Sequence, residues 1–533
     1  MNKFVRESAS FGPASSLGLS DSHSVTGASA LPFLLEDYAG VATWSGKPIY
    51  NHDQVINQID SGAQISGKTI TFSFLDGPHT IGLYNNPTVG FSEPGGYSPM
   101  SDAEKTVARQ AMALWDDLIA PSVVEKTGYG ADIVLANTTT GPAQAWTYYP
   151  GNGFKYQGDV WSADPTVNWS NDWLGYGGYG RTTLVHEIGH SLGLSHPGDY
   201  NYSDDNNGDG VPDPITYEGD AFYAQDTQQF SIMSYFSDQK SGGQAIDVSL
   251  GLLQNPQTPL LHDILTIQSK YGADANTRSG DTVYFAHSTA GNGVYDLAQN
   301  PFPYLSVYDA GGNDTFDFST ANSGVFLDLR PGSFSSATAG YQTLDEANAA
   351  TAAFNAVTDA SQGDFALWDS ASYASWVGLV QSIGASRVRA DTGVSGITAT
   401  SDDNISIAYN TIIENAIGGS ARDYLVGNDV ANQLSGNGGN DVLYGLKGND
   451  TLNGGSGNDL FVFDNDGSTD TIADFQTGAD KIDLHGVAGA TSGWVTYNSA
   501  THQVAIDTDH NGVADMFINS MNTVATGDIL FHA

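Results

Sequence analysis

The chain has no cysteine among its 533 residues. Disulfide bonds and thiolate metal sites are therefore excluded, and any metal ion must be held by histidine nitrogen or by carboxylate, amide or carbonyl oxygen. A latency switch that depends on a cysteine thiolate is excluded for the same reason.

Basic residues are scarce, since 18 Lys and Arg stand against 60 Asp and Glu and leave a formal net charge of −42. Such a charge repels nucleic acid and anionic membranes and attracts cations. Solubility alone would account for the charge, but many of the acids lie in Gly/Asn/Asp clusters, where oxygen ligands can converge on Ca²⁺. We therefore predict no nucleic-acid partner and several bound calcium ions.

Long apolar runs are absent. No run is long enough to cross a bilayer, and the stretch from Met1 to about Ser22 lacks the apolar segment of roughly 7–15 residues that a secretory signal requires. The sequence predicts neither membrane insertion nor an N-terminal signal peptide. Export would need another signal.

A chain of this length exceeds one hydrophobic core, so at least two domains are expected. Residues 1–40 are rich in Ser, Gly and Ala and form either a leader, such as a short propeptide, or an ordinary disordered terminus. Residues 41–272 mix strand-like and helical segments, one of which starts at the N-cap signal Ser101-Asp-Ala-Glu104. Residues 273–533 turn to Gly, Asn, Asp and short β-type runs. This order predicts an α+β domain followed by an all-β domain.

One stretch of the second domain differs from its surroundings. Residues 341–400 are rich in Ala and Ser and carry Trp368 and Trp376, which favours an inserted helical piece. A lid, a partner surface and a neutral extension are all compatible with this composition.

A metal-binding pattern occupies residues 186–197, which read His-Glu-Ile-Gly-His-Ser-Leu-Gly-Leu-Ser-His-Pro. On a helix, His186 and His190 lie four residues apart and therefore on one face, so both imidazoles can reach one ion. Gly193 can take a positive φ and end the helix, which turns the chain back and lets His196 supply a third nitrogen. Three protein ligands leave one position for water, as in a catalytic zinc site.

Glu187 follows the first histidine, where it can act as a general base. Zinc lowers the pKa of a bound water to about 7, and Glu187 is placed to take that proton. Downstream, Ser231-Ile-Met-Ser-Tyr235 carries Met233 where a methionine turn would floor such a site, although Met233 alone is more often typical of core packing. Together these residues predict hydrolysis by a zinc-activated water.

A nine-residue repeat runs through residues 418–462. Glycine at the first position permits a tight turn, and the apolar eighth position fills the interior of stacked short strands. The sixth-position carboxylates can bind Ca²⁺ between successive coils and would otherwise repel one another, so we expect this roll to fold only with calcium. The three positions are Gly418, Gly427, Gly436, Gly445 and Gly454; Leu425, Leu434, Leu443, Leu452 and Phe461; and Asp423, Asn432, Asp441, Asp450 and Asp459.

With these motifs the chain resembles the serralysin family of metzincin peptidases, from about Trp44 to the C-terminus. Two further segments carry the likeness, Asp159-Val-Trp161 and Leu261-His-Asp-Ile264. The resemblance implies a metzincin catalytic domain followed by a parallel β-roll of RTX repeats, and a secreted zinc endopeptidase of broad specificity, made as a zymogen. It implies one catalytic zinc ion on His186, His190 and His196.

The same resemblance assigns roles around the cleft. It implies that Tyr235 contributes its phenol either as an extra zinc ligand or as a hydrogen-bond donor to the oxyanion. Polypeptide substrates would lie extended along an edge strand, which the likeness locates at Ala143, Ala145 and Trp146, although Trp146 could equally be a core aromatic.

The resemblance also implies structural calcium ligands along the second domain. Units one and two of the repeat depart from the family pattern, because Ala421 and Val430 replace glycine and Asn432 replaces aspartate. The implied ligands are Arg278, Gly280, Thr282, Asp309, Gly311, Gly312, Asp314, Glu414, Gly419, Asp423, Gly439, Asp441, Gly448, Asp450, Gly455, Gly457, Asp459, Asp474 and Asp480.

Two loops resemble EF-hand ligand series, with polar turns as the alternative interpretation. The first follows the zinc pattern closely, so calcium there could brace the cleft. They contain Asp205, Asn207, Asp209 and Asp213, and Asp507, Asp509, Asn511 and Asp515.

Export is expected through a one-step channel. Extracellular modules bind calcium at about 10⁻⁴–10⁻³ M, so the roll would stay loose inside the cell and fold outside. The family uses an uncleaved C-terminal signal read by a type I secretion apparatus, and Asp528-Ile-Leu-Phe531 resembles it, although His532 and Ala533 follow. We expect a secreted monomer.

Two other classes of protein compete with this interpretation. A calcium-binding adhesin or surface protein would explain the roll and the charge, but not the three histidines together with Glu187 and Met233. An exported lipase would carry a Gly-x-Ser-x-Gly nucleophile elbow, which the chain lacks.

Overall fold

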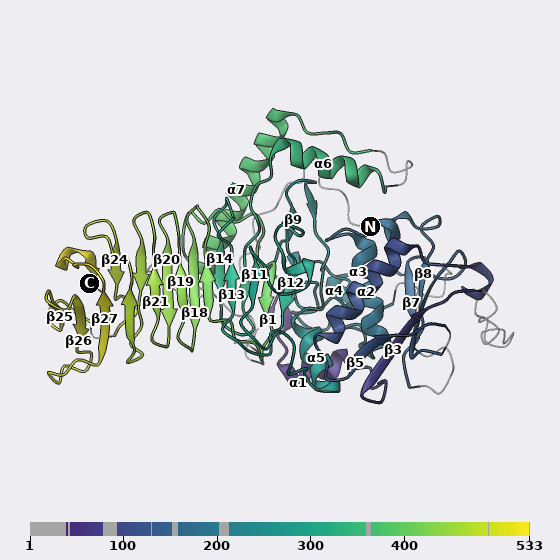
Figure 1. Ribbon diagram of the computed structural model, residues 1–533, viewed down its shortest axis with the longest axis horizontal. Coiled ribbons are helices and arrows are strands. Elements are labelled where there is room, and N and C mark those ends of the chain that lie inside the picture. Colours follow the sequence, from purple (N-terminus) through teal and green to yellow (C-terminus); the bar gives the residue numbers. More distant parts are fainter. Residues whose placement is uncertain are drawn as a thin grey trace.

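The computed structural model describes residues 39–40, 43–77, 93–128, 130–151, 158–201, 213–358, 364–488 and 490–531. The molecule is elongated, with helices and a mixed sheet at one end and a long stack of short strands at the other (Figure 1). The predicted fold class, an α+β region followed by a parallel β-roll, is confirmed.

A twisted sheet and four helices of eight or more residues build the described N-terminal part. The sheet runs in the order β5-β3-β6-β8-β7, with β4 paired to β6, and its pairs are parallel except for β7 with β8 and β4 with β6. β7 is therefore an antiparallel edge strand. The elements are α1 (His52–Ile59), β3 (Thr69–Phe74), β4 (Tyr97–Ser98), α2 (Asp102–Asp116), β5 (Ser122–Glu125), β6 (Ile133–Thr138), β7 (Ala145–Thr147), β8 (Val160–Ala163), α3 (Tyr179–Ser191) and α5 (Leu261–Tyr271).

Helix α2 starts where the sequence predicted. Ser101 accepts a hydrogen bond from the Glu104 amide, and the Glu104 carboxylate accepts one from the Ser101 amide, which satisfies two amides that the first turn leaves unpaired. Its buried face carries Val107, Ala111 and Trp115, which pack against α3. Helix α3, which carries His186 and His190, is thus packed against α2.

Short elements complete this part and lead into the roll. They are β1 (Thr43–Trp44), β2 (Lys47–Pro48), α4 (Tyr217–Asp220), β9 (Ile246–Asp247), β10 (Leu252–Leu253), β11 (Val283–Phe285), β12 (Leu305–Val307), β13 (Thr315–Asp317), β14 (Phe326–Asp328) and β15 (Phe334–Ser335).

Between residues 415 and 483, successive strands of the roll alternate between two parallel sheets (Figure 1), and the larger of these sheets ends in antiparallel strands. Leu425 pairs in register with Leu443 in one sheet and Leu434 with Leu452 in the other, and all four side chains are buried between the sheets. One coil is therefore two repeat units long. The strands are β16 (Ile405–Ile407), β17 (Asn415–Ile417), β18 (Tyr424–Asn428), β19 (Gln433–Ser435), β20 (Val442–Leu446), β21 (Thr451–Asn453), β22 (Leu460–Val462), β23 (Thr469–Ile472), β24 (Lys481–Asp483), β25 (Val495–Asn498), β26 (Gln503–Ile506), β27 (Met516–Ser520) and β28 (Ile529–Leu530).

Two helices, α6 (Leu344–Asn355) and α7 (Ser370–Thr392), lie between β15 and β16 and stand out from the long axis of the molecule (Figure 1). Trp368 and Trp376 donate indole hydrogen bonds to the carbonyls of Ser249 and Val248, at 2.8 and 2.9 Å. These contacts dock the helices on the N-terminal part. Among the described residues, no helix combines the length and apolarity that a bilayer crossing requires.

Candidate metal centre

Three histidine side chains converge at the end of α3. His186 and His190 project from α3, and His196 comes from the turn that follows it. Each ring is oriented by a hydrogen bond from Nδ1 to a backbone carbonyl, at Ile232 (2.8 Å), Leu194 (2.7 Å) and Tyr200 (2.9 Å) respectively. These bonds place the proton on Nδ1 and leave each Nε2 with a lone pair.

The three Nε2 atoms fit a tetrahedral metal ion. They stand 3.1 Å apart for His190 and His196 and 3.3 Å apart for His196 and His186. Around an ion with metal–nitrogen bonds of about 2.0–2.1 Å, neighbouring nitrogens in a tetrahedron would be about 3.3–3.4 Å apart. Since none of these nitrogens carries a proton, they cannot hydrogen-bond to one another. A shared cation would satisfy all three lone pairs.

Burial keeps the three rings neutral. It lowers the pKa of His186 to about 4 and that of His196 to about 3. Burial also lowers the pKa of His190 well below its usual value, and the other two imidazoles add to the effect. The lone pairs are therefore available to a metal at neutral pH.

Glu187 lies on α3 next to His186, and its side chain is buried. Burial raises its pKa to about 7, while a hydrogen bond from the Thr147 hydroxyl to Glu187 Oε2 (2.6 Å) acts in the opposite direction. Thr147 belongs to the edge strand β7 and also bonds to the Glu187 carbonyl at 3.1 Å. The carboxyl group is thus suited to exchange a proton near neutral pH.

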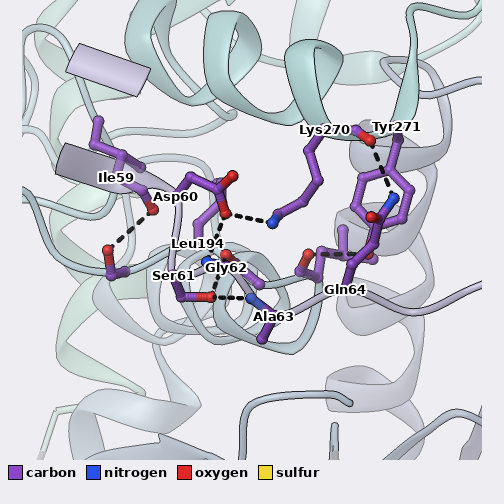
Figure 2. A network of polar contacts seen from close by, with 12 residues as sticks. Ile59, Asp60, Ser61, Gly62, Ala63, Gln64, Leu194, Lys270 and Tyr271 are labelled. Carbon is purple, nitrogen blue, oxygen red and sulfur yellow. Dashed lines mark hydrogen bonds and ion pairs between the residues drawn. The ribbon is translucent and has the colours of Figure 1, made fainter. Parts of the chain in front are cut away.

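The turn that carries His196 is held by the segment after α1 (Figure 2). Ser61 donates to the Gly193 carbonyl from its amide (3.2 Å) and from its hydroxyl (2.6 Å), and Asp60 forms a β-bridge with Leu194. Gly193 has φ +94°, and a Cβ there would stand 2.0 Å from the Ala63 carbonyl oxygen. Only glycine fits this approach.

The end of helix α5 contacts the same region (Figure 2). Lys270 pairs with Asp60, and the Tyr271 hydroxyl donates to the Leu192 carbonyl at 3.0 Å. A cavity of about 600 Å³ opens in front of this network, between residues 61–64 and 149–151. The Tyr149 ring meets His190 edge-on at 5.7 Å, so the cavity adjoins the histidine cluster.

Met233 is fully buried under α3. A Cβ at Gly189 would stand 2.8 Å from Met233 Sδ and 3.0 Å from the Trp115 ring, so the helix can approach the methionine only through glycine. Asp263 joins the turn to α5, because its carboxylate accepts from the Ile232 amide (2.7 Å) and from the Ser231 hydroxyl (2.7 Å). Ile232, whose carbonyl orients His186, is therefore held in place by Asp263.

Tyr235 lines the open side of the cluster. Its ring centroid lies 4.5 Å from that of His196 and 6.0 Å from that of His186, and the side chain is 40% exposed. The neighbouring Ser234 and Tyr200 hydroxyls both donate to Asp226, at 2.7 and 2.8 Å. These contacts hold the preceding residue, Ser234, and the Tyr200 ring, whose centroid lies 5.1 Å from that of Tyr235.

The predicted substrate strand is tied to α3. Asn171 donates to the Ala163 carbonyl and to the Gln144 carbonyl, and the Gln144 amide reaches Thr183 on α3 at 3.1 Å. Trp146 is 38% exposed and donates its indole N–H to the buried Glu93 at 2.8 Å, which places it at the surface rather than in the core. Ala145 pairs with Ser162, and the carbonyl of Ala143 accepts a bond from Asn168.

The sixth-position acids of the roll form two columns. In one, Oδ1 of Asp441, Asp459 and Asp480 accepts from the amide of the preceding acid in the column, at 2.8, 3.0 and 3.0 Å. In the other, Asp450 accepts from Asn432 (2.8 Å) and Asp470 from Asp450 (3.0 Å). Gly454 and Gly455 donate to Asp474, and Gly419 to Asp423.

The remaining oxygens of these columns lack a hydrogen-bond donor. Oδ2 of Asp441, Asp450 and Asp459 is buried and has no partner in the described part of the chain. Burial raises the pKa of Asp441 to about 7 and that of Asp450 to about 8, with the next acid of the column adding repulsion. An all-oxygen set of this kind fits Ca²⁺.

Fourth-position glycines bring coils into close contact. A Cβ would stand 2.4 Å from a carbonyl oxygen at Gly439, 2.5 Å at Gly448 and 1.5 Å at Gly457. The carbonyls opposite the first two belong to Ala421 and Val430, the residues that depart from the repeat. Turn carbonyls therefore stand beside the acid columns.

A second acidic group lies at the start of the roll. The Asp314 amide donates to Glu414 (2.7 Å) and Asp314 Oδ1 accepts from Thr282 (2.8 Å), while Asp314 Oδ2 is buried without a partner in the described residues. Asp309 accepts from Gly311, and Gly312 packs on Gly280. The Arg278 guanidinium pairs with Asp117 at 2.6 Å, so Arg278 could offer a cation only its carbonyl.

Of the two EF-hand-like loops, one is described. Carboxylate oxygens of Asp507, Asp509 and Asp515 lie within 4.8 Å of one another, and the Asn511 amide bonds to Asp507 and Asp509. In the other loop Asp205, Asn207 and Asp209 lie outside the described residues, and Asp213 stands at their edge.

Several residues escaped the sequence analysis. Asp470 continues an acid column at a spacing of 20 rather than 18 residues, so the nine-residue phase does not reveal it. Gly189 and Thr147 act through neighbours distant in sequence. Of these residues, only Gly189 offered a signal in the sequence, because glycine is unfavourable inside a helix and Gly189 lies within the histidine pattern.

Comparisons with known proteins agree with this geometry. A sequence model described as "Peptidase M10 serralysin C terminal" matches residues 273–372 and 381–531. "Metallopeptidase AprA" of Pseudomonas marginalis is 34% identical over 93% of this chain and 94% of its own length. "Serralysin G" of Dickeya chrysanthemi is 35% identical over 89% and 86%, and "Metalloprotease AprA" of Pseudomonas entomophila 34% over 97% and 96%.

Proposed function

The chain belongs to the serralysin family of extracellular zinc metalloendopeptidases, and on that basis we propose that His186, His190 and His196 hold its catalytic zinc ion while Glu187 is the general base. The observation that carries this assignment is the convergence of three unprotonated Nε2 atoms at tetrahedral spacing. The alternative of a non-catalytic calcium-binding surface protein leaves that convergence without a purpose.

Zinc, when bound, supplies a Lewis acid that acidifies water and polarises the peptide carbonyl. The chain's own residues do the rest. Glu187 takes a proton from the attacking water and delivers it to the leaving amine, for which a pKa near 7 is suited. Thr147 orients that carboxylate. Tyr235 stands on the open side, where its phenol can meet the developing oxyanion either directly or as a ligand.

The substrate polypeptide is proposed to add to the edge of β7, along Ala143, Ala145 and Trp146. The exposed Trp146 and the position of β7 at the sheet edge support this placement. Because main-chain pairing tolerates many side chains, broad specificity follows. The cavity beside Tyr149 continues the cleft from the histidine cluster.

Several structural Ca²⁺ ions are proposed for the acid columns, the group at Asp309, Asp314 and Glu414, and the loop at Asp507. The buried carboxylate oxygens that lack a donor support the first two, and the clustered carboxylates support the third. Each ion would also take turn carbonyls from neighbouring coils. We assign the catalytic domain to residues 41–272 and the roll to 273–533, with the helices of 341–400 as an addition.

Serralysin family proteins are secreted. For this chain we propose a type I apparatus that reads the C-terminal residues, with Asp528-Ile-Leu-Phe531 as the signal. Asp528 bonds to Lys481 at 2.6 Å, and β28 pairs with β24, so the signal would be exposed before the roll folds and covered afterwards.

The test is casein hydrolysis by full-length protein refolded in calcium and zinc. Glu187→Gln should lose roughly 10²-fold or more in kcat/KM while zinc content stays at one per molecule, because only the base is removed. Glu218→Gln, an exposed surface variant, is the matched control and should keep wild-type activity. Undiminished turnover in Glu187→Gln would overturn the assignment, and inactivity of zinc-loaded wild type would favour the surface-protein alternative.

A further inference from the structure

Three places in the described residues gather acidic or histidine side chains within 4.8 Å, and two of them are the zinc cluster and the Asp507 loop. The third consists of Asp391, in the last turn of α7, and Asp402 and Asp403, just before β16. It lies outside the nine-residue repeat and outside the zinc centre. None of the roles proposed above involves it.

Among the described residues, the charge of this group is only partly balanced. Asp402 is buried and Asp403 half-buried. The cation beside them is Arg387, which approaches Asp402 at 3.4 Å. When all three acids are ionised, two negative charges are left uncompensated. Burial and mutual repulsion accordingly raise the pKa of Asp403 to about 8.

A buried amide faces the same group. Gln229 is 3% exposed, and its Nε2 lies 3.2 Å from Asp403 Oδ2, whereas its Oε1 has no hydrogen-bond partner in the described residues. Half a turn of the amide exchanges the two atoms and brings Oε1 beside the carboxylates. A buried amide oxygen without a donor, half a turn of the amide away from the Asp403 carboxylate, is what a cation bound beside these acids would satisfy.

We propose that Asp391, Asp402, Asp403 and the Gln229 side-chain oxygen form a calcium site. The oxygens are hard ligands, which favours Ca²⁺ or Mg²⁺ over transition metals. Two oxygens on opposite sides of one Ca²⁺ would be about 4.6–5.2 Å apart, and the carboxylate oxygens here span at most 4.8 Å. Smaller Mg²⁺ requires a tighter shell.

The site would fasten three segments together. Gln229 stands two residues before Ser231, whose hydroxyl bonds to Asp263 beneath the methionine turn. Arg387 on α7 donates to the Gly242 carbonyl at 2.9 Å. Asp402 exchanges backbone hydrogen bonds with Gln244 at 2.8 and 2.9 Å. Calcium would therefore lock α7 and the start of β16 onto the loop that leads into the zinc floor.

Calcium binding to full-length protein is measured by equilibrium dialysis across about 10⁻⁶–10⁻³ M calcium. Asp403→Asn should remove one bound calcium ion per molecule, or lower the affinity for that ion at least tenfold. The control is Asp364→Asn, an exposed acid in the loop between α6 and α7, which should bind as wild type does. Asp391→Asn repeats the test at an exposed position, in case Asp403→Asn fails to fold.

Hydrogen exchange locates the effect. Calcium should slow exchange in segments 227–231 and 386–404 of wild type, and this local protection should be at least tenfold weaker in Asp391→Asn, with protection of the roll retained. Binding curves and local protection identical to wild type in Asp391→Asn would overturn the proposal. Neither readout depends on peptidase activity.

Discussion

The zinc centre and the acid columns of the roll both aim buried ligand atoms at points with no protein partner, but they differ in what holds those atoms. Each imidazole of the zinc centre is neutral and anchored by a carbonyl, so the ligands keep their positions without an ion. The carboxylates of the roll repel one another and leave buried oxygens without donors. We therefore expect one region to be preorganised for its metal and the other to depend on calcium to fold.

The largest effect should come from removing calcium. Without it, amide exchange in residues 415–530 should accelerate by orders of magnitude while α3 and α2 stay protected, because the acid columns lose their counter-ions and the zinc helix does not. Stripping zinc alone should leave both regions protected. Equal loss of protection in α3 and in the roll upon calcium removal would break the comparison.

A methyl group at Gly189 tests the preorganisation of the zinc centre. Gly189→Ala would push α3 away from Met233 and Trp115, and displacing such supporting contacts typically costs about 10–100-fold in metal affinity. Competition with a zinc chelator measures it. Gly378→Ala on α7, where a Cβ meets nothing within 4 Å, is the control and should leave zinc affinity unchanged.

A single acid of the columns should have a smaller effect. Asp450→Asn removes one charge from a buried position, so the calcium concentration at half-maximal folding, followed by circular dichroism, should rise roughly tenfold, or about 1.4 kcal/mol. Asp429→Asn removes a charge from an exposed pair with Lys447 and should not shift this calcium midpoint. Equal midpoints for the two variants would argue against calcium in the columns.

The smallest expected change is in the pH profile. The Thr147 hydroxyl stabilises the ionised form of Glu187 and lowers its pKa, so Thr147→Val should raise that pKa. Because the base acts when deprotonated, the acid limb of kcat/KM should move to higher pH, with activity falling several-fold near pH 6 and little near pH 9. The control is Thr182→Val, which lies on α3 like Glu187 but donates its hydroxyl to Pro256 instead. A uniform loss at all pH values would mean a structural defect.

The two regions also differ in how far sequence reasoning reaches. The roll repeats a local rule, so Gly436 and Leu443 identify their own positions, and the order of its strands follows. The zinc ligands are close in sequence and equally visible. Hidden from the sequence are contacts between distant segments, such as Asp263 with Ile232 and Thr147 with Glu187, because no local spacing encodes them.

The segment after α1 sets a limit on engineering this peptidase. Ser61 grips the Gly193 carbonyl across 132 residues of chain, and Ser195 returns a bond to Ile59. A truncation, tag junction or circular permutation placed after α1 would leave every zinc ligand in the product and still release the turn that carries His196. The smallest independent catalytic fragment must therefore include residues 59–63, well upstream of the residues that perform the chemistry.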